Sequence, residues 1–66
     1  MISFDPLWVT LKTKGLNKGE LQKLTGFSSS TIAKLSKNEV VKFDIVERIC
    51  EKLDVPIEDV VEIRKS

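Results

Sequence analysis

The side chains best suited to chemistry in this sequence are a run of hydroxyl groups, Ser28 to Thr31, followed by Lys34 and Lys37. Hydroxyl groups both donate and accept hydrogen bonds, and an ammonium group donates hydrogen bonds and carries a positive charge. Small polar side chains beside cations suit close-range recognition of a polar, negatively charged surface. The combination therefore predicts binding rather than the making or breaking of bonds.

Residue types that carry out catalysis are scarce. The chain has no histidine, the commonest general base, and its single cysteine, Cys50, cannot form an internal disulfide. It has neither a glycine-rich phosphate loop nor a metal-ligand spacing. Cys50 lies on the apolar face of a predicted helix and is expected to be a small buried hydrophobe. We expect no enzymatic activity, no catalytic residue, no metal and no cofactor.

Length and composition narrow the class of protein. The 66 residues are enough for one domain, residues 1–66, and a composition of 41% hydrophobic and 32% charged residues is typical of soluble globular proteins. No apolar run approaches the roughly 20 residues of a membrane-spanning helix. The N-terminus lacks the basic and apolar regions of a signal peptide. These features predict a cytoplasmic protein without membrane association.

The net charge of +1 hides an uneven distribution. Residues 12–42 contain seven lysines and two glutamates, whereas residues 43–66 contain seven acidic and four basic residues. A basic middle and an acidic tail are typical of a protein with a face that binds a polyanion. Lysines that only solubilise exposed helices would give the same pattern, so charge alone leaves the partner open.

About five short helices are predicted to position these side chains. Asp5, as N-cap, and Pro6 open the first helix. Pro56 begins the fifth helix. Residues 60–63 could instead form a strand paired with residues 2–4, so a short terminal β-ribbon stays open. The fourth helix, residues 43–53, has an amphipathic spacing of apolar positions: Phe43, Val46, Ile49, Cys50 and Leu53.

The second and third helices have clear ends. Asn17 caps the second helix in a capping-box pattern with Glu20, and Gly26 ends it where a positive φ is expected. Ser28 can cap the third helix, and Asn38 is a plausible left-handed stop. The residues expected to face inward on the two helices are Leu21, Leu24, Ile32 and Leu35. Those expected to hold the helices together at an angle are Leu21, Phe27, Ile32 and Leu35.

Helix, short turn and helix over residues 16–38 form the pattern of a helix-turn-helix. In this motif the second helix lies in the major groove of DNA, and its first turns meet the base edges. Residues 16–57 resemble the Cro/CI (XRE) helix-turn-helix family. The resemblance rests on Leu21, Gly26, Phe27-Ser28, Ser30 to Ile32, Leu35, Ile49, Leu53, Val55 and Ile57.

The resemblance implies an all-α, lambda-repressor-like domain that binds double-stranded DNA and regulates transcription, most often as a repressor. Carried over by position, it implies that Ser29, Ser30 and Lys34 read bases. The residues expected to contact phosphate are Lys18, Thr31, Lys37, Asn38 and Lys42.

Four positions depart from the family pattern. Lys18 stands where glutamine is common in the family, and Ser36 stands where glutamate is frequent. Asn38 occupies a position that is often glycine, and Lys42 occupies one that is often a capping serine. Three of the four, Lys18, Asn38 and Lys42, can still bond to phosphate. We expect Lys18, Lys34 and Lys42 to lie on the same side as the start of the third helix.

A homodimer on a roughly palindromic site is expected, because one third helix reads only a few base pairs. Self-association could use the first helix with Trp8, or the fifth helix with residues 60–63, and the C-terminal segment is favoured. Residues 60–63 could instead cover the far side of the monomer's own core, and Trp8 is expected to be a core residue or a dimer contact. An alternative function is a protein-interaction module that docks a partner through its acidic C-terminal part. No small-molecule ligand is expected, because no separate ligand domain is present.

Overall fold

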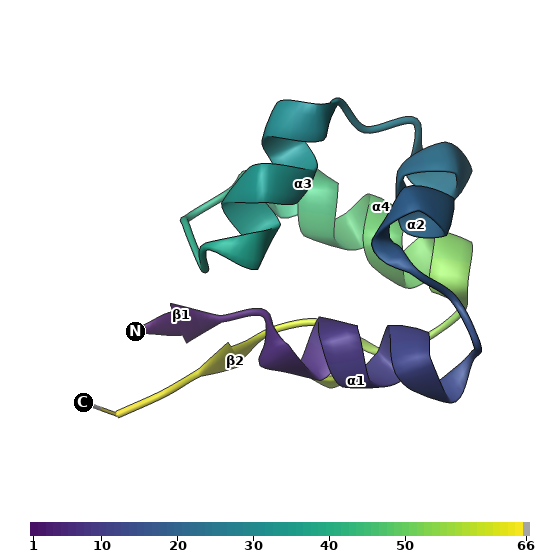
Figure 1. The fold of residues 1–66 in the computed structure, drawn as a ribbon. Coiled ribbons are helices and arrows are strands. Elements are labelled where there is room, and N and C mark those ends of the chain that lie inside the picture. The colour runs from purple at the N-terminus through teal and green to yellow at the C-terminus, as the bar shows by residue number, and fades with distance from the viewer. Residues whose placement is uncertain (66) are drawn as a thin grey trace.

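The structure, a computed structural model, describes residues 1–65 (Figure 1). Its elements in chain order are β1 (Ile2–Ser3), α1 (Asp5–Thr13), α2 (Lys18–Thr25), α3 (Ser29–Ser36), α4 (Phe43–Leu53), the 3-10 helix η1 (Ile57–Asp59) and β2 (Glu62–Ile63). The predicted helical bundle is confirmed, and the terminal ribbon that stayed open is present. β1 and β2 pair antiparallel, with Ile2 opposite Ile63, so the two ends of the chain lie side by side.

The core lies where the four α-helices meet, and each helix contributes to it. Leu7 of α1, Leu21 of α2, Leu35 of α3 and Ile49 of α4 are completely buried. Val60, just after η1, closes the core from the C-terminal side. Each such side chain stabilises the fold by about 1.5–3 kcal/mol relative to an exposed position. These residues fix how α2 and α3 are held against the rest of the molecule.

The helix ends around the central turn follow the sequence. Asn17 Oδ1 accepts a hydrogen bond from the Glu20 backbone N–H at 2.8 Å, and Glu20 Oε1 accepts one from the Asn17 N–H at 3.1 Å, which completes the capping box. Ser28 Oγ accepts from the Thr31 N–H at 3.3 Å. Gly26 and Asn38 have φ values of 74° and 57°, so both predicted left-handed positions are confirmed.

Two residues expected to face inward are exposed. Leu24 is 44% exposed because Thr25, not Leu24, takes the second inward position of α2, one turn after Leu21. Thr25 can be buried because its hydroxyl donates to the Leu21 carbonyl at 2.8 Å. Phe43 is 84% exposed because it is the first residue of α4, and the buried stripe of that helix begins one turn later at Val46.

Two details of the helix boundaries also differ. The N-cap of α1 is Phe4, and Asp5 is already the first helical residue, where its charge favours the helix dipole. The expected fifth helix is the single 3-10 turn η1, because the chain must enter β2 three residues later. Cys50 is half-buried against the core, and the partial burial raises the pKa of its thiol.

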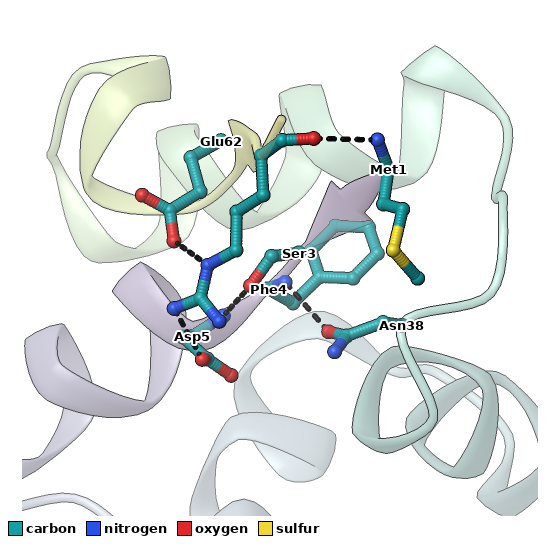
Figure 2. Close-up of polar contacts among 7 residues, drawn as sticks. Met1, Ser3, Phe4, Asp5, Asn38 and Glu62 are labelled. Atoms are coloured by element: carbon teal, nitrogen blue, oxygen red, sulfur yellow. Dashed lines mark hydrogen bonds and ion pairs between the residues drawn. The ribbon is translucent and has the colours of Figure 1, made fainter. Parts of the chain in front are cut away.

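Polar contacts fasten the ribbon to the helices (Figure 2). Asn38 Oδ1 accepts a hydrogen bond from the Phe4 N–H at 2.7 Å, which ties the end of α3 to the N-terminal segment. The Met1 ammonium donates to the Arg64 carbonyl at 2.8 Å, and the Arg64 guanidinium pairs with Asp5 and Glu62 at 2.6 and 2.8 Å. Within residues 1–65, no helix is long and apolar enough to cross a membrane.

Candidate nucleic-acid interface

The helix-turn-helix leaves the first turn of α3 on the surface. Phe27, Ile32 and Leu35 are buried, whereas Ser28, Ser29 and Ser30 are exposed. The apolar side of α3 therefore faces the core, and its first turn presents short hydroxyl side chains to solvent. Short side chains permit a partner surface to approach the helix closely.

The hydroxyl groups at this end of α3 form a connected set. Ser28 Oγ lies 2.9 Å from Ser30 Oγ and 3.2 Å from Thr31 Oγ1, in addition to capping the helix. Because Ser28 Oγ already accepts from a backbone N–H, its own proton is free to point to Ser30 or Thr31. The set is held close to the backbone, and Thr31 is its most buried member. Ser28 thus acts as the N-cap of α3, as its position in the sequence predicts.

Gln22 also lies at this surface, although no role was predicted for it from the sequence. Its Nε2 donates a hydrogen bond to Ser29 Oγ at 3.3 Å, which links α2 to the first residue of α3. Gln22 also lies four residues after Lys18, so the two share one face of α2. A polar residue one turn after a candidate phosphate contact was the available signal. That Gln22 would meet Ser29 depends on the angle between α2 and α3.

Two of the candidate lysines gather near the outer side of α3. Thr31, Lys34 and Lys42 line one shallow depression, together with Val40 and Ile45. Lys34 is exposed on α3, and Lys42 precedes α4. The structure therefore brings together one candidate base contact and two candidate phosphate contacts.

Lys18 lies at the other end of α3. Its Nζ donates to Ser36 Oγ at 2.9 Å, and Ser36 is the last residue of the helix. The same Nζ is 4.5 Å from the centroid of the Trp8 ring, so a cation–π contact from α1 holds it from the second side. Trp8 is half-buried against the core, as expected. Lys18 flanks the end of α3 rather than its start, which corrects that expectation.

The remaining candidates lie in the turn after α3. Lys37 is exposed at the C-cap of the helix. Asn38 uses its side-chain oxygen for the Phe4 N–H, so its amide NH2 is the group left for a phosphate. Among residues 1–65, no cluster of three or more histidine, cysteine, aspartate or glutamate side chains could hold a metal ion.

The two helices of the motif pack their apolar sides into the core, the first turn of α3 is polar and exposed, and lysines flank it. These features define a helix-turn-helix DNA-binding domain. Residues 6–66 match the Cro/C1-type HTH DNA-binding domain family, and the chain belongs to that family.

The structure is also similar to the crystal structure of the transcriptional regulator VanUg, with a TM-score of 0.93 and 38% sequence identity. The match covers 98% of this chain and 87% of the other. None of the curated proteins matches the chain.

Proposed function

We propose that the chain, acting as a single domain over residues 1–66, is a sequence-specific transcriptional repressor that binds duplex DNA as a homodimer. In this proposal α3 enters the major groove, where Ser29, Ser30 and Lys34 read base edges. The groups that contact phosphate are those of Lys18, Thr31, Lys37, Asn38 and Lys42.

The observation that carries this proposal is the exposed first turn of α3, where Ser28, Ser29 and Ser30 present hydroxyl groups to solvent. In the major groove each base pair presents a distinct pattern of donors and acceptors, which hydroxyl and ammonium groups can match. Lysine most often meets guanine O6 and N7, so Lys34 is assigned to a guanine. The transcriptional regulator VanUg, with the same fold at 38% identity, supports a role in transcription. Repression follows from occupancy of a promoter.

The test is selection of bound fragments from random duplex DNA with the full chain, followed by affinity measurements over a range of salt concentrations. We expect one enriched, roughly palindromic motif. The plot of log affinity against log salt should fall with a slope of about −0.9 per phosphate contact. Failure to enrich any motif would overturn sequence-specific reading. If the chain binds DNA without this salt dependence, phosphate contacts are absent. That result would favour the alternative function, docking of a protein partner through the acidic C-terminal part.

The repressor role needs a separate measurement. A reporter gene placed behind the selected motif should be transcribed less when the protein is present. A reporter with a scrambled motif is the control. Increased transcription from the intact motif would identify an activator and contradict repression.

A further inference from the structure

In the part of the chain that the structure describes, β1 and β2 form a two-stranded sheet, so each strand has one edge that no other strand covers. The Met1 ammonium donates to the Arg64 carbonyl at 2.8 Å, and the Arg64 N–H donates to the Met1 carbonyl at 2.7 Å. Residue pairs that exchange hydrogen bonds in this way alternate with pairs that do not. Ile2, opposite Ile63, is therefore in a pair of the second kind, and its N–H and C=O point away from β2.

The outer edge of β1 faces the segment that joins α3 to α4. The Phe4 N–H, two residues after Ile2 and on the same edge, donates to Asn38 Oδ1 at 2.7 Å (Figure 2). Val40 and Val41 follow Asn38 in this segment, and both line a groove together with Ile2. The outward N–H and C=O of Ile2 therefore lie beside that groove.

The groove is largely apolar and has a volume of about 460 Å³, within the range of about 300–1,000 Å³ that is usual for ligand pockets. Phe4 and Val46 line it and are almost completely buried, so they form its floor. Val40, Phe43 and Ile63 also line it, and they are 76%, 84% and 75% exposed. A contiguous set of exposed apolar side chains of this kind marks a binding surface.

The charges around the groove are negative. Its charged lining residues are Glu58 and Glu62. An adjoining hollow that shares Phe43 with the groove has Asp44 and Glu47 as its charged lining residues. Of these four carboxylates, Glu62 alone has an ion-pair partner within residues 1–65. The surface therefore favours a partner that brings cations, and its charge disfavours a nucleic acid.

We infer that the groove binds an extended segment of a partner protein, which adds to β1 as a further strand and carries basic residues. The backbone of the segment bonds to the N–H and C=O of Ile2, as in strand addition at an exposed sheet edge. Successive side chains of a strand point to opposite faces, so alternate apolar side chains of the segment enter the groove. Its basic residues pair with the surrounding carboxylates. Because β1 is two residues long, the contact is short and the affinity low.

This surface differs from the proposed DNA-binding surface, so the inference does not rest on the proposed function. Ser29, Ser30 and Lys34 are not among the residues that line the groove. The two surfaces also differ in charge, because lysines lie beside α3 whereas carboxylates surround the groove. A partner in the groove therefore leaves the first turn of α3 free for DNA.

The test begins with a library of short random peptides displayed on phage and selected on the immobilised full chain. We expect enriched peptides that have apolar residues at alternate positions and lysine or arginine among the others. The most enriched peptide is then synthesised, and its affinity for the full chain is measured by NMR titration. Failure to enrich any peptide, or enrichment of acidic peptides, would overturn the inference.

N-methylation of the synthetic peptide, one backbone amide at a time, tests whether it binds as a strand. The Ile2 C=O accepts from a single peptide N–H, so affinity should fall about two- to tenfold at one position. The N–H groups directly before and after that position point away from β1, so their methylation should have little effect. Equal losses at neighbouring positions, or no loss at any position, would contradict strand addition.

Two variants of the protein, each with a matched control, test the backbone contact and the charge. Ile2→Pro removes the outward N–H, and proline is tolerated on edge strands, so peptide affinity should fall about two- to tenfold. Ile2→Val keeps the N–H and should bind the peptide like the wild type. Glu58→Gln should weaken binding by up to about fivefold. Its control is Glu51→Gln, because Glu51 is exposed on α4 and lines neither hollow.

Circular dichroism checks that each variant folds, and the N-methylated peptides test the backbone contact on the wild type if Ile2→Pro does not. Unchanged peptide affinity in both Ile2→Pro and Glu58→Gln would place the peptide elsewhere and overturn the inference. Self-association of the chain that the peptide displaces would identify a second copy as the occupant and would also overturn it. A chain that binds the peptide but no DNA would contradict the proposed function alone.

Discussion

Gln22 on α2 donates a hydrogen bond from Nε2 to Oγ of Ser29, the first residue of α3, at 3.3 Å. Because Ser29 Oγ accepts from this amide, its own O–H proton is directed elsewhere. The Ser29 hydroxyl is thereby arranged as a donor toward whatever lies in front of α3. A donor selects acceptors, and in the major groove these are guanine O6 and N7, adenine N7 and thymine O4.

Gln22→Ala should broaden sequence preference at the base pair that Ser29 is proposed to read. Without the amide, the serine hydroxyl rotates freely and can accept as well as donate, so cytosine N4 becomes an allowed partner. Selection experiments with the wild type and the variant measure this directly. Lys23→Ala, at the next and exposed position of α2, is the control and should return the wild-type motif. An unchanged motif in Gln22→Ala would show that the hydrogen bond does not shape recognition.

Lys34 and Lys42 should respond differently to replacement by alanine, although they line the same depression. Lys34→Ala should cost about 1–3 kcal/mol on the selected site and relax the choice at one base pair per half-site. Lys42→Ala should weaken all sequences equally and flatten the salt slope by about one unit per copy. Competition titrations at several salt concentrations separate the two behaviours. Identical selected motifs for wild type and Lys34→Ala would refute its assignment as a base contact.

The Trp8 ring should contribute to DNA affinity through Lys18, which it holds at 4.5 Å. A cation–π contact at an exposed site contributes about 0.5–1 kcal/mol, so Trp8→Leu should weaken DNA binding about two- to fivefold. In Lys18→Ala the same Trp8→Leu change should have no further effect. A double-mutant cycle measures that coupling, and additive losses would mean that Trp8 acts through the packing of α1.

The ends of α2 and the start of α3 could be predicted because they depend on residues close together in the sequence. Asn17 with Glu20, Ser28 and Gly26 each satisfy backbone groups within a few positions, so composition and spacing are sufficient. Leu24 could not be placed correctly, because hydrophobicity favours it over Thr25 as a buried residue. The internal hydrogen bond of Thr25 removes that preference.

In the candidate site, too, the features that depend on local sequence could be predicted, and the contacts between helices could not. The hydroxyl row on α3 follows from local sequence, and its members lie where the helix period places them. The partners of Lys18 and Gln22 belong to other helices, so they depend on how α1, α2 and α3 cross. The exposure of Phe43 could not be predicted from the period of α4, because Phe43 is the first residue of the helix and the buried stripe begins one turn later at Val46.

The thiol of Cys50 should be slow to react near neutral pH. Burial raises its pKa, with smaller contributions in the same direction from Asp59, Glu51 and Glu58, so the protonated form persists to higher pH in the folded chain. Between the unfolded and folded pKa values the unfolded state binds fewer protons, so stability falls as pH rises through that interval. Alkylation rates from pH 7 to 10, compared with the chain in urea, should show the higher midpoint. Cys50→Ser should lack this pH-dependent loss of stability.

Asn38 performs two tasks that glycine and alanine can separate. Its φ of 57° requires a left-handed backbone, and its Oδ1 accepts from the Phe4 N–H at 2.7 Å. Asn38→Gly keeps the backbone conformation and loses the hydrogen bond, so it should cost about 0.5–1.5 kcal/mol. Asn38→Ala loses the same hydrogen bond but, unlike the glycine variant, keeps a Cβ in the left-handed region without the polar side chain that lets asparagine adopt it, which adds about 1 kcal/mol. Urea denaturation should therefore order stability as wild type, then glycine, then alanine. If both variants were equally stable, the backbone at position 38 would carry no conformational cost, and the hydrogen bond to Phe4 would be the whole contribution of this side chain.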